Sequence, residues 1–328
     1  MKRKLMSVAL IILIISVLAA CGSDSSSAEG KPDKIRLDYA YYSPTSLVLK
    51  EQGWLEEALE NEGIGVEWVL SQGSNKALEF LTSDSIDFGS SAGSAALVSK
   101  SKGSPIQNIY IYSQPEWTAL VANNESGIQS VEELKGKKVA ATLGTDPYIF
   151  LLRALNEAGL SANDLEIVNL QHGDGAVALS KGSVDAWAGL DPHMARAELE
   201  SDANLFYRNK EFNTYGFLNV RKDFAEEYPD YVDVVIGAYE KAREWTIDNP
   251  EEAAKILSEE AEMSLDVAKQ TLERNDFSNP IPGDEHRDTL RNSAEVLLEG
   301  EVIEASTDIE KVVNELVQPS FIEGLNND

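Results

Sequence analysis

Small hydroxyl residues, glycine and amide side chains gather in three short segments, each directly before a predicted helix. The segments are Tyr41-Tyr42-Ser43, Gln72-Gly73-Ser74-Asn75 and Ser90-Ser91-Ala92-Gly93-Ser94. Exposed N–H groups at a helix start, assisted by the helix dipole, attract an anion without a cationic side chain. Several such starts facing one point would suit a sulfonate, a sulfate ester or a carboxylate. Ser43, Ser74 and Ser94 could instead be simple N-caps, each worth about 1 kcal/mol.

Three equivalent segments follow later in the chain. They are Leu143-Gly144-Thr145-Asp146-Pro147, Gln171-His172-Gly173-Asp174 and Leu190-Asp191-Pro192. Asp146 before a proline is well suited to begin a helix. If it faces a ligand instead, that ligand should carry an amine or another cationic nitrogen. Asp191 has the same two interpretations, and His172 could donate a hydrogen bond to a ligand.

Aromatic side chains near these segments could hold the apolar part of a ligand, although an aromatic residue more often belongs to a core. The candidates are Tyr41, Tyr42, Trp117, Tyr148, Trp187 and Tyr215. His193 and His286 are expected on the surface. The predicted ligand-binding residues are Tyr42, Ser43, Gln72, Ser74, Ser91, Ser94, Trp117, Thr145, Asp146, His172, Trp187 and Asp191. No catalytic residue, metal ligand or cofactor is expected.

The elements that position these residues form a strand and helix pattern that occurs twice. Strands are predicted at 35–41, 66–70 and 86–89, with helices at 44–60, 75–82 and 94–100. The second unit has strands at 136–141, 165–170 and 184–188, and helices at 147–158, 176–181 and 192–199. Further helices at 231–248, 250–258, 264–274 and 284–298 should pack on the first unit. We expect two α/β lobes, with the ligand outside the carboxyl ends of the strands, in a cleft between them.

The composition argues against several classes of protein. The 328 residues carry 56 acidic and 28 basic side chains, a net charge of −28, and no basic cluster for binding nucleic acid. Cys21 is the single cysteine, so no internal disulfide, cysteine nucleophile or thiolate metal site can form beyond it. Neither a Gly-x-Ser-x-Gly nor a His-Glu-x-x-His motif occurs. After the N-terminus no apolar run approaches the roughly 20 residues of a spanning helix.

The N-terminus has the pattern of a secretory signal. Lys2, Arg3 and Lys4 precede an apolar run that ends in Leu18-Ala19-Ala20-Cys21. The last four residues resemble the bacterial lipobox, in which the cysteine is lipidated and cleavage exposes its amine. An ordinary signal peptide cut near Ala20 is the alternative. We therefore expect a signal peptide at 1–20 and a lipidated cysteine with a flexible tether at 21–32, which would hold the protein outside the cell on its membrane.

Six motifs, in this order and spacing, resemble the extracytoplasmic solute-binding proteins of ABC importers, in the branch for aliphatic sulfonates, taurine and nitrate. They are Gly53-Trp54-Leu55, Ser85-Ile86-Asp87-Phe88-Gly89, Leu134-Lys135-Gly136-Lys137-Lys138-Val139, Leu151-Leu152-Arg153-Ala154-Leu155, Gly182-Ser183-Val184-Asp185-Ala186-Trp187 and Asn249-Pro250-Glu251-Glu252-Ala253-Ala254. The resemblance covers essentially the whole mature chain. Asp146 departs from it, because the family usually has a small neutral residue there.

This resemblance implies an α/β, two-lobed periplasmic-binding-protein-like (type II) fold, with two mixed sheets flanked by helices and joined by two crossing strands. Lobe one would comprise 33–116 and 220–328, and lobe two 117–219. The implied function is capture of a small solute, such as an aliphatic sulfonate or taurine, by a monomer that closes on it and delivers it to an ABC permease with a cytoplasmic ATPase.

Two alternatives stay open. The solute could be nitrogenous, such as a thiamin-pyrimidine precursor, or the chain could be an enzyme resembling the thiamin-pyrimidine synthases. The chemistry of those enzymes is associated with a cysteine-rich motif, which the mature chain lacks. For a binding protein, Asp191→Ala should weaken ligand binding and leave the melting temperature of the ligand-free protein little changed.

Overall fold

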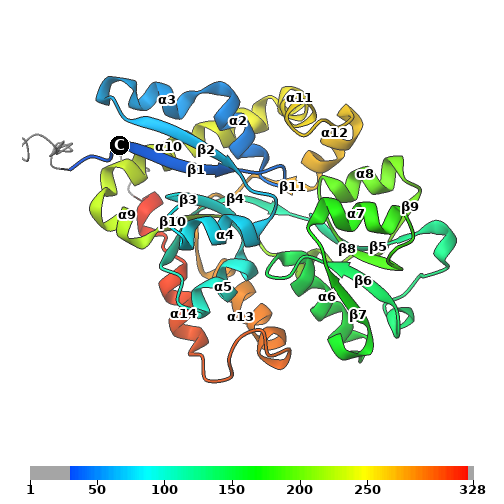
Figure 1. The fold of residues 1–328 in the computed structure, drawn as a ribbon. Coiled ribbons are helices and arrows are strands. Elements are labelled where there is room, and N and C mark those ends of the chain that lie inside the picture. Colours follow the sequence, from blue (N-terminus) through cyan, green and yellow to red (C-terminus); the bar gives the residue numbers. More distant parts are fainter. Residues whose placement is uncertain (1–29, 324–328) are drawn as a thin grey trace, which may run out of the picture.

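Two β-sheets, each flanked by helices, form the two lobes of the computed structural model, which describes residues 30–323 (Figure 1). The first sheet has the strand order β11-β4-β10-β3-β1-β2. Its strands are β1 Lys34–Tyr39, β2 Gly65–Leu70, β3 Phe88–Ala92, β4 Ile106–Pro115, β10 Gly216–Arg221 and β11 Asn275–Asp276. The predicted signal peptide and Cys21 lie outside the described residues.

The second sheet is built entirely from the middle of the chain, in the order β7-β6-β8-β5-β9. Its strands are β5 Thr118–Asn123, β6 Lys138–Ala141, β7 Glu166–Asn169, β8 Ala186–Leu190 and β9 Ala203–Tyr207. The chain enters this sheet from β4 into β5 and leaves it from β9 into β10. Only two connections therefore join the sheets.

Both sheets are mixed, which confirms the predicted fold class. Strand β1 pairs in parallel with β2 and β3, and β6 pairs in parallel with β7 and β8. One strand at each crossing runs in the opposite direction: β10 is antiparallel to β3 and β4, and β5 is antiparallel to β8 and β9. The carboxyl ends of the parallel strands of each sheet open toward the other lobe (Figure 1).

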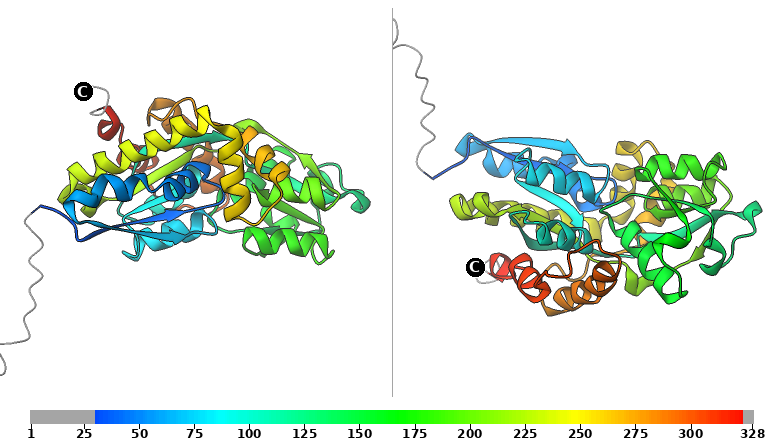
Figure 2. Two further views of the ribbon diagram at one scale, coloured as in Figure 1. Left: turned by 90° about the horizontal axis from the view of Figure 1, so that it is seen from above. Right: turned by 60° about the horizontal axis from the view of Figure 1, so that its bottom comes forward.

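The helices cover both faces of each sheet. They are α2 Pro44–Gln52, α3 Trp54–Leu59, α4 Ser74–Thr82, α5 Gly93–Ser101, α6 Asp146–Glu157, α7 His172–Ser180, α8 His193–Glu200, α9 Lys222–Glu227, α10 Pro229–Asp248, α11 Pro250–Glu260, α12 Leu265–Glu273, α13 Asp284–Glu299, α14 Ile309–Leu316 and α15 Ser320–Glu323. In the two views of Figure 2 the C-terminal helices lie against the first lobe, as predicted, and the second lobe lies beside it.

The predicted helix at 44–60 is interrupted at one glycine. Gly53 has φ 65°, in the left-handed region, and its N–H bonds to the carbonyl oxygens of Leu49 and Lys50. A glycine enters this conformation without the steric cost that a Cβ imposes, and it is a common helix end. The chain consequently forms two helices, α2 and α3, around this corner.

The largest core surrounds the first sheet and includes buried side chains of α10, α11, α13 and α14. Two smaller cores lie on the faces of the second sheet, one with Phe150 of α6 and one with Met194 of α8. In the part of the chain that is described, no helix combines the length and apolar content needed to cross a membrane. Among the same residues no group of three or more His, Cys, Asp or Glu side chains could hold a metal ion.

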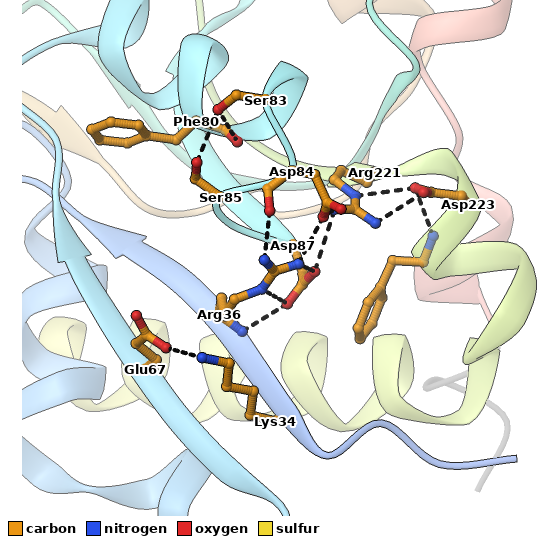
Figure 3. Close-up of polar contacts among 11 residues, drawn as sticks. Lys34, Arg36, Glu67, Phe80, Ser83, Asp84, Ser85, Asp87, Arg221 and Asp223 are labelled. Carbon is orange, nitrogen blue, oxygen red and sulfur yellow. Dashed lines mark hydrogen bonds and ion pairs between the residues drawn. The ribbon is translucent and has the colours of Figure 1, made fainter. Parts of the chain in front are cut away.

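A charged cluster lies on the first sheet near the start of β1 (Figure 3). The Arg36 backbone N donates to Asp87 Oδ2 at 2.8 Å, and Arg36 Nη2 lies 2.6 Å from Asp87 Oδ1. Arg36 also bonds Asp84, while Arg221 pairs with Asp223 at 2.9 Å and with Asp84. These contacts tie β1, the turn before β3 and the end of β10 together, so the cluster has a structural role.

Candidate functional site

A cleft of about 440 Å³ separates the lobes at the carboxyl ends of their strands. Lobe one contributes the segments after β1 and β2, and lobe two contributes the starts of α7 and α8. The lining residues are Tyr41, Tyr42, Leu70, Ser71, Gln72, Gln171, His172, Gly173, Asp174, Val177, Leu190, Asp191, Pro192, His193 and Arg196. This size lies within the range of small-molecule sites.

Two helix starts form the wall that lobe two presents to the cleft. Gln171 is the N-cap of α7 and makes no side-chain cap bond, and Gly175 is the first residue of this helix whose N–H reaches a helical acceptor, the Gln171 carbonyl. The first N–H groups of a helix have no partner within it. The N–H groups of His172, Gly173 and Asp174 therefore give this wall a positive potential, and α8 begins beside them at His193.

Arg196 is the one Arg or Lys side chain on the cleft wall among the described residues. It lies one turn after His193 in α8, and its Nη2 donates to the carbonyl oxygen of Glu262 at 2.9 Å. Glu262 follows α11 of lobe one. Arg196 consequently lines the cleft and also bonds the opposite lobe.

The proton position on His172 follows from its neighbours. Thr142 Oγ1 donates its only proton to the Leu170 carbonyl at 2.6 Å, so it must accept from His172 Nδ1 at 3.2 Å. Burial, and to a smaller extent nearby His193, lower the pKa of His172 to about 3. His172 is therefore a neutral imidazole that carries its proton on Nδ1.

The lobes touch where His172 meets Gly73 of lobe one. A Cβ placed on Gly73 would lie 2.8 Å from Asn75 Oδ1 of its own lobe and 2.9 Å from His172 Nε2 of the opposite lobe, and both distances are shorter than ordinary Cβ contacts. The φ of Gly73 is extended, a conformation open to any residue. Glycine is thus needed here for the close approach of the lobes and not for the backbone conformation.

Asp191 is held by groups from both lobes. Its Oδ1 accepts from the Ala195 N–H of α8 at 2.9 Å and from Arg274 Nη1 at 3.1 Å. Arg274 follows α12 of lobe one and also donates from Nη2 to Glu198 at 2.5 Å. Burial raises the pKa of Asp191 to about 7, although Arg274 opposes this shift. We call Arg274, Asp191 and Glu198 the Arg274 bridge.

The wall from lobe one is aromatic and is supported by a buried carboxyl group. Tyr42 donates from its hydroxyl to the Ser90 carbonyl at 3.1 Å, and its ring packs edge to face against Trp117. Ser71 on the same wall donates to Asp38 at 2.5 Å. Burial raises the pKa of Asp38 to about 6, while hydrogen bonds from Ser71 and Ser90 oppose the shift. These bonds hold Tyr42 in place beside the cleft.

Four of the predicted binding residues line this cleft: Tyr42, Gln72, His172 and Asp191. Two others, Ser94 and Trp117, instead bond Asp146 in the connection between the lobes. Asp146 Oδ1 accepts from Ser94 Oγ at 2.5 Å and Thr214 Oγ1 at 2.7 Å, and Oδ2 accepts from Trp117 Nε1 at 2.9 Å and the Thr214 N–H at 3.0 Å. All four donors come from the protein, so we leave Asp146 out of the proposed ligand contacts.

The remaining predicted residues lie elsewhere and make protein contacts. Ser74 Oγ accepts from the Ala92 N–H, Ser91 Oγ donates to the Ala92 carbonyl, and Thr145 Oγ1 donates to the Thr142 carbonyl. Ser43 is the N-cap of α2 but makes no side-chain cap bond. Trp187 is fully buried in the core of lobe two. The N-cap alternative also finds no support at Ser74 or Ser94, because both lie within their helices.

Several residues of the site were not predicted from the sequence, among them His193, Arg196 and Arg274. His193 lies on the cleft wall and His286 is fully buried, so the expectation that both are on the surface is wrong. Arg196 and Arg274 were not singled out, because a charged residue on a predicted helix normally faces solvent. The spacing of three residues between His193 and Arg196 puts both on one face of α8, and this spacing is a signal by which they could have been identified.

Comparisons with known proteins identify relatives along almost the whole chain. The family model described as NMT1/THI5 like matches residues 45–253. A Bacillus subtilis (strain 168) protein, provisionally named as binding aliphatic sulfonates, is 32% identical over 93% of this chain and 93% of its own. The taurine-binding periplasmic protein of Escherichia coli (strain K12) is 27% identical over 58% of this chain and 61% of its own.

Solved structures share the fold. The alkanesulfonate-binding protein SsuA from Xanthomonas axonopodis pv. citri, bound to MOPS, has a TM-score of 0.79 at 21% identity, over 86% of this chain and 98% of that one. The periplasmic aliphatic sulphonate-binding protein SsuA from Escherichia coli has a TM-score of 0.75 at 24% identity, over 88% and 93%. The desulfurization enzyme DSZB also aligns, with a TM-score of 0.66 at 14% identity, over 90% and 99%. With a family model matching more than half of its length, this chain belongs to the NMT1/THI5-like family and has the periplasmic-binding-protein fold.

Proposed function

We propose that this protein captures a small organic sulfonate in the cleft and delivers it to the permease of an ABC importer. The observation that carries the proposal is the uncapped start of α7, which lies on the same cleft wall as the Arg196 side chain. A helix start and one cation can together hold a permanently charged anion in a site from which water is excluded. The start of α8 adds less, because Asp191 already accepts the Ala195 N–H there. The names of the sulfonate-binding relatives support the same solute class.

The opposite wall suits the organic part of such a solute. Tyr41 and Tyr42 face the cleft with Leu70, while Val177 and Leu190 add apolar surface from lobe two. Gln72 and Asp191 complete the proposed polar contacts. His172 lines the cleft but is not among these contacts, because its Nδ1 bonds Thr142 and its Nε2 lies against Gly73. Because the ligand would touch both lobes, it would favour the closed state, which the permease then recognises. We propose a monomer that performs no chemistry on its solute.

A lipid anchor would keep this binding protein beside its permease outside the cell. We propose that Cys21 is lipidated after removal of residues 1–20 and that the following residues act as a tether. Cys21→Ser should move the protein from the membrane fraction to the medium or periplasm. Retention of the variant in washed membranes would argue against the anchor.

Calorimetry with the purified protein tests the proposed solute class. Butanesulfonate and taurine should bind, and recovery of unchanged ligand separates a binding protein from an enzyme. Arg196→Gln should weaken butanesulfonate binding by about tenfold or more, as expected for loss of a hydrogen bond to a charged group. Failure of every sulfonate to bind would refute the proposal.

A nitrogenous solute is the second candidate, because two acidic residues, Asp174 and Asp191, line the cleft. A thiamin-pyrimidine precursor could place a cationic nitrogen beside Asp174. The same calorimetry with an aminopyrimidine decides between the two classes. An enzyme of the thiamin-pyrimidine-synthase type is the least favoured alternative, since the chain has no cysteine after Cys21.

A further inference from the structure

His193 is a histidine of the cleft wall with no protein partner. It is the first residue of α8 and lies against the first turn of α7, where a Cβ on Gly173 would be 3.3 Å from His193 Cε1. Among the hydrogen bonds of residues 30–323, none involves a ring nitrogen of His193. Its imidazole is therefore available to a group inside the cleft.

The neighbouring histidine cannot serve in the same way. His172 donates a hydrogen bond from Nδ1 to Thr142 Oγ1, and its Nε2 is covered by Gly73 of the opposite lobe. The Nε2 atom is buried and has no partner. Of the two histidines on this wall, only His193 keeps a ring nitrogen for the ligand.

Several charged and titratable groups share the cleft with His193. Asp174 and His172 come from α7, Arg196 from α8 and Asp191 from the end of β8, with Tyr41 and Tyr42 on lobe one. Arg274 and Glu198 lie behind Asp191. Burial, and to a smaller extent Arg196, lower the pKa of His193 to about 4, although Asp174 opposes this shift. With the cleft empty, His193 is consequently neutral at pH 7.

We infer that His193 takes up a proton from solvent when an anionic head group occupies the cleft, and thereby hydrogen-bonds that group as a cation. The inference rests on the proposed function. A sulfonate remains an anion throughout the range of histidine titration, so a pH dependence must come from the protein. A neighbouring negative charge favours the charged imidazolium.

The direction of the pH effect follows from linkage. Because the bound anion raises the pKa of His193 above its value in the empty cleft, the complex holds more protons than the free protein between the two pKa values. Affinity must therefore rise as pH falls through the pKa of the complex, and level off below the pKa of the free protein. Each unit of difference between the two pKa values makes binding up to tenfold tighter.

Calorimetry with butanesulfonate at pH 5.0 and 7.5, in two buffers of different ionisation enthalpy, measures this proton uptake. We expect tighter binding at pH 5.0, with up to one proton taken up. His193→Gln should abolish the uptake. Asp191 also has a raised pKa and could take up a proton itself, so Asp191→Asn is measured as well. Its affinity for butanesulfonate should fall, but the proton uptake per bound ligand should persist.

Histidine ring NMR of the unmutated protein gives a second measurement, in which His193→Gln serves only to assign one signal. The chain has three histidines, so three ring signals are expected. One signal, which His193→Gln removes, should titrate at higher pH when butanesulfonate is bound. If butanesulfonate binds with pH-independent affinity, or if uptake persists in His193→Gln, the inference is overturned while the proposed function stands. If butanesulfonate does not bind at either pH, both are overturned.

Discussion

Asp146 shows how a single residue can be committed to structure at a position where the sequence suggested ligand chemistry. Its carboxylate is buried and accepts four hydrogen bonds: one from Ser94 of α5, one from Trp117 at the first crossing, and two from the backbone and side chain of Thr214 at the second crossing. An anion placed at this helix start is favoured by the helix dipole. The Asp146 carboxylate therefore occupies the anion-binding position at the start of α6. A small neutral residue at position 146 would leave this position open.

Substitutions at Asp146 should separate the shape of the side chain from its charge. In Asp146→Asn one amide oxygen can still accept from Trp117 Nε1 and the Thr214 N–H, while the hydroxyls of Ser94 and Thr214 can turn to accept from the amide nitrogen. We expect this variant to lose about 1 kcal/mol of unfolding free energy. Asp146→Ala strands two buried N–H donors and should lose about 3 kcal/mol or more. Urea unfolding checks both values, and equal losses would contradict this account of the network.

Asp191 requires a revision of the expectation drawn from sequence. Its removal would leave the Arg274 guanidinium, whose side chain is 9% exposed, without one of its two carboxylate partners and would uncap α8. Asp191→Ala should therefore lower the unfolding free energy of the ligand-free protein by about 3 kcal/mol, where the sequence alone suggested little change. Asp288→Ala removes a carboxylate that is 70% exposed and paired with Arg291, and should change it by about 0.5 kcal/mol or less. Unfolding curves that coincide for Asp191→Ala and the unmutated protein would show that the Arg274 bridge does not stabilise the fold.

At the scale of elements, the order of strands and helices could be predicted, because each element shows the apolar spacing typical of its type. The predicted start of one helix was wrong, because glycine residues in its first turn weaken the apolar periodicity. The helix at 176–181 begins four residues earlier, at His172, since Gly173 and Gly175 weaken the helical signal in its first turn. That turn carries His172 and Asp174 of the cleft. Glycine at a ligand-facing helix start thus hid part of the site from sequence reasoning.

The cleft contacts that join different elements could not be predicted at all. Arg274 and Asp191 are 83 residues apart, and the pairing of α12 with the end of β8 depends on how the lobes close. A periodic pattern describes which face of a helix is buried but not which helix of the other lobe it meets. Tyr42, Gln72, His172 and Asp191 were found because they follow strands, where open α/β sheets bind ligands.

The start of α4 meets the start of α7 through a contact that only glycine permits, so Gly73→Ala should impair closure. The new methyl group would clash with Asn75 Oδ1, which makes no hydrogen bond among the described residues and can turn away, and with His172 of the other lobe unless the lobes separate by a few tenths of an ångström. We expect butanesulfonate affinity to fall about tenfold or more while the variant folds normally, since the φ of Gly73 suits alanine. Gly237→Ala in α10 is the matched control, because no atom lies within 4 Å of the new Cβ. Equal affinities in the two variants would show that the Gly73 contact does not limit closure.

At the scale of the whole molecule, the lobes are linked on one side of the cleft by polar bonds between α8 and the segments α11 and α12. Arg196 reaches the Glu262 carbonyl, Arg274 reaches Asp191 and Glu198, and Ser264 Oγ donates to Glu200 at 2.6 Å. Figure 1 shows α12 directly beside α8. Because Arg196 and Asp191 also line the cleft, a ligand that orders them stabilises the same contacts that hold the lobes together.

Glu198→Gln tests this coupling at a residue outside the cleft lining. Glu198 accepts from Arg274 across the lobes, and the loss of its charge should weaken the closed state relative to the open one. A ligand that binds the closed state must then supply the difference, so butanesulfonate affinity should fall by about three- to tenfold. Glu259→Gln is the control, since Glu259 is 69% exposed and pairs with Lys255 of its own helix. Small-angle scattering should show a smaller ligand-induced compaction in Glu198→Gln than in Glu259→Gln. If both variants bind and compact alike, the bond between Arg274 and Glu198 does not contribute to closure, and the cleft contacts alone must close the lobes.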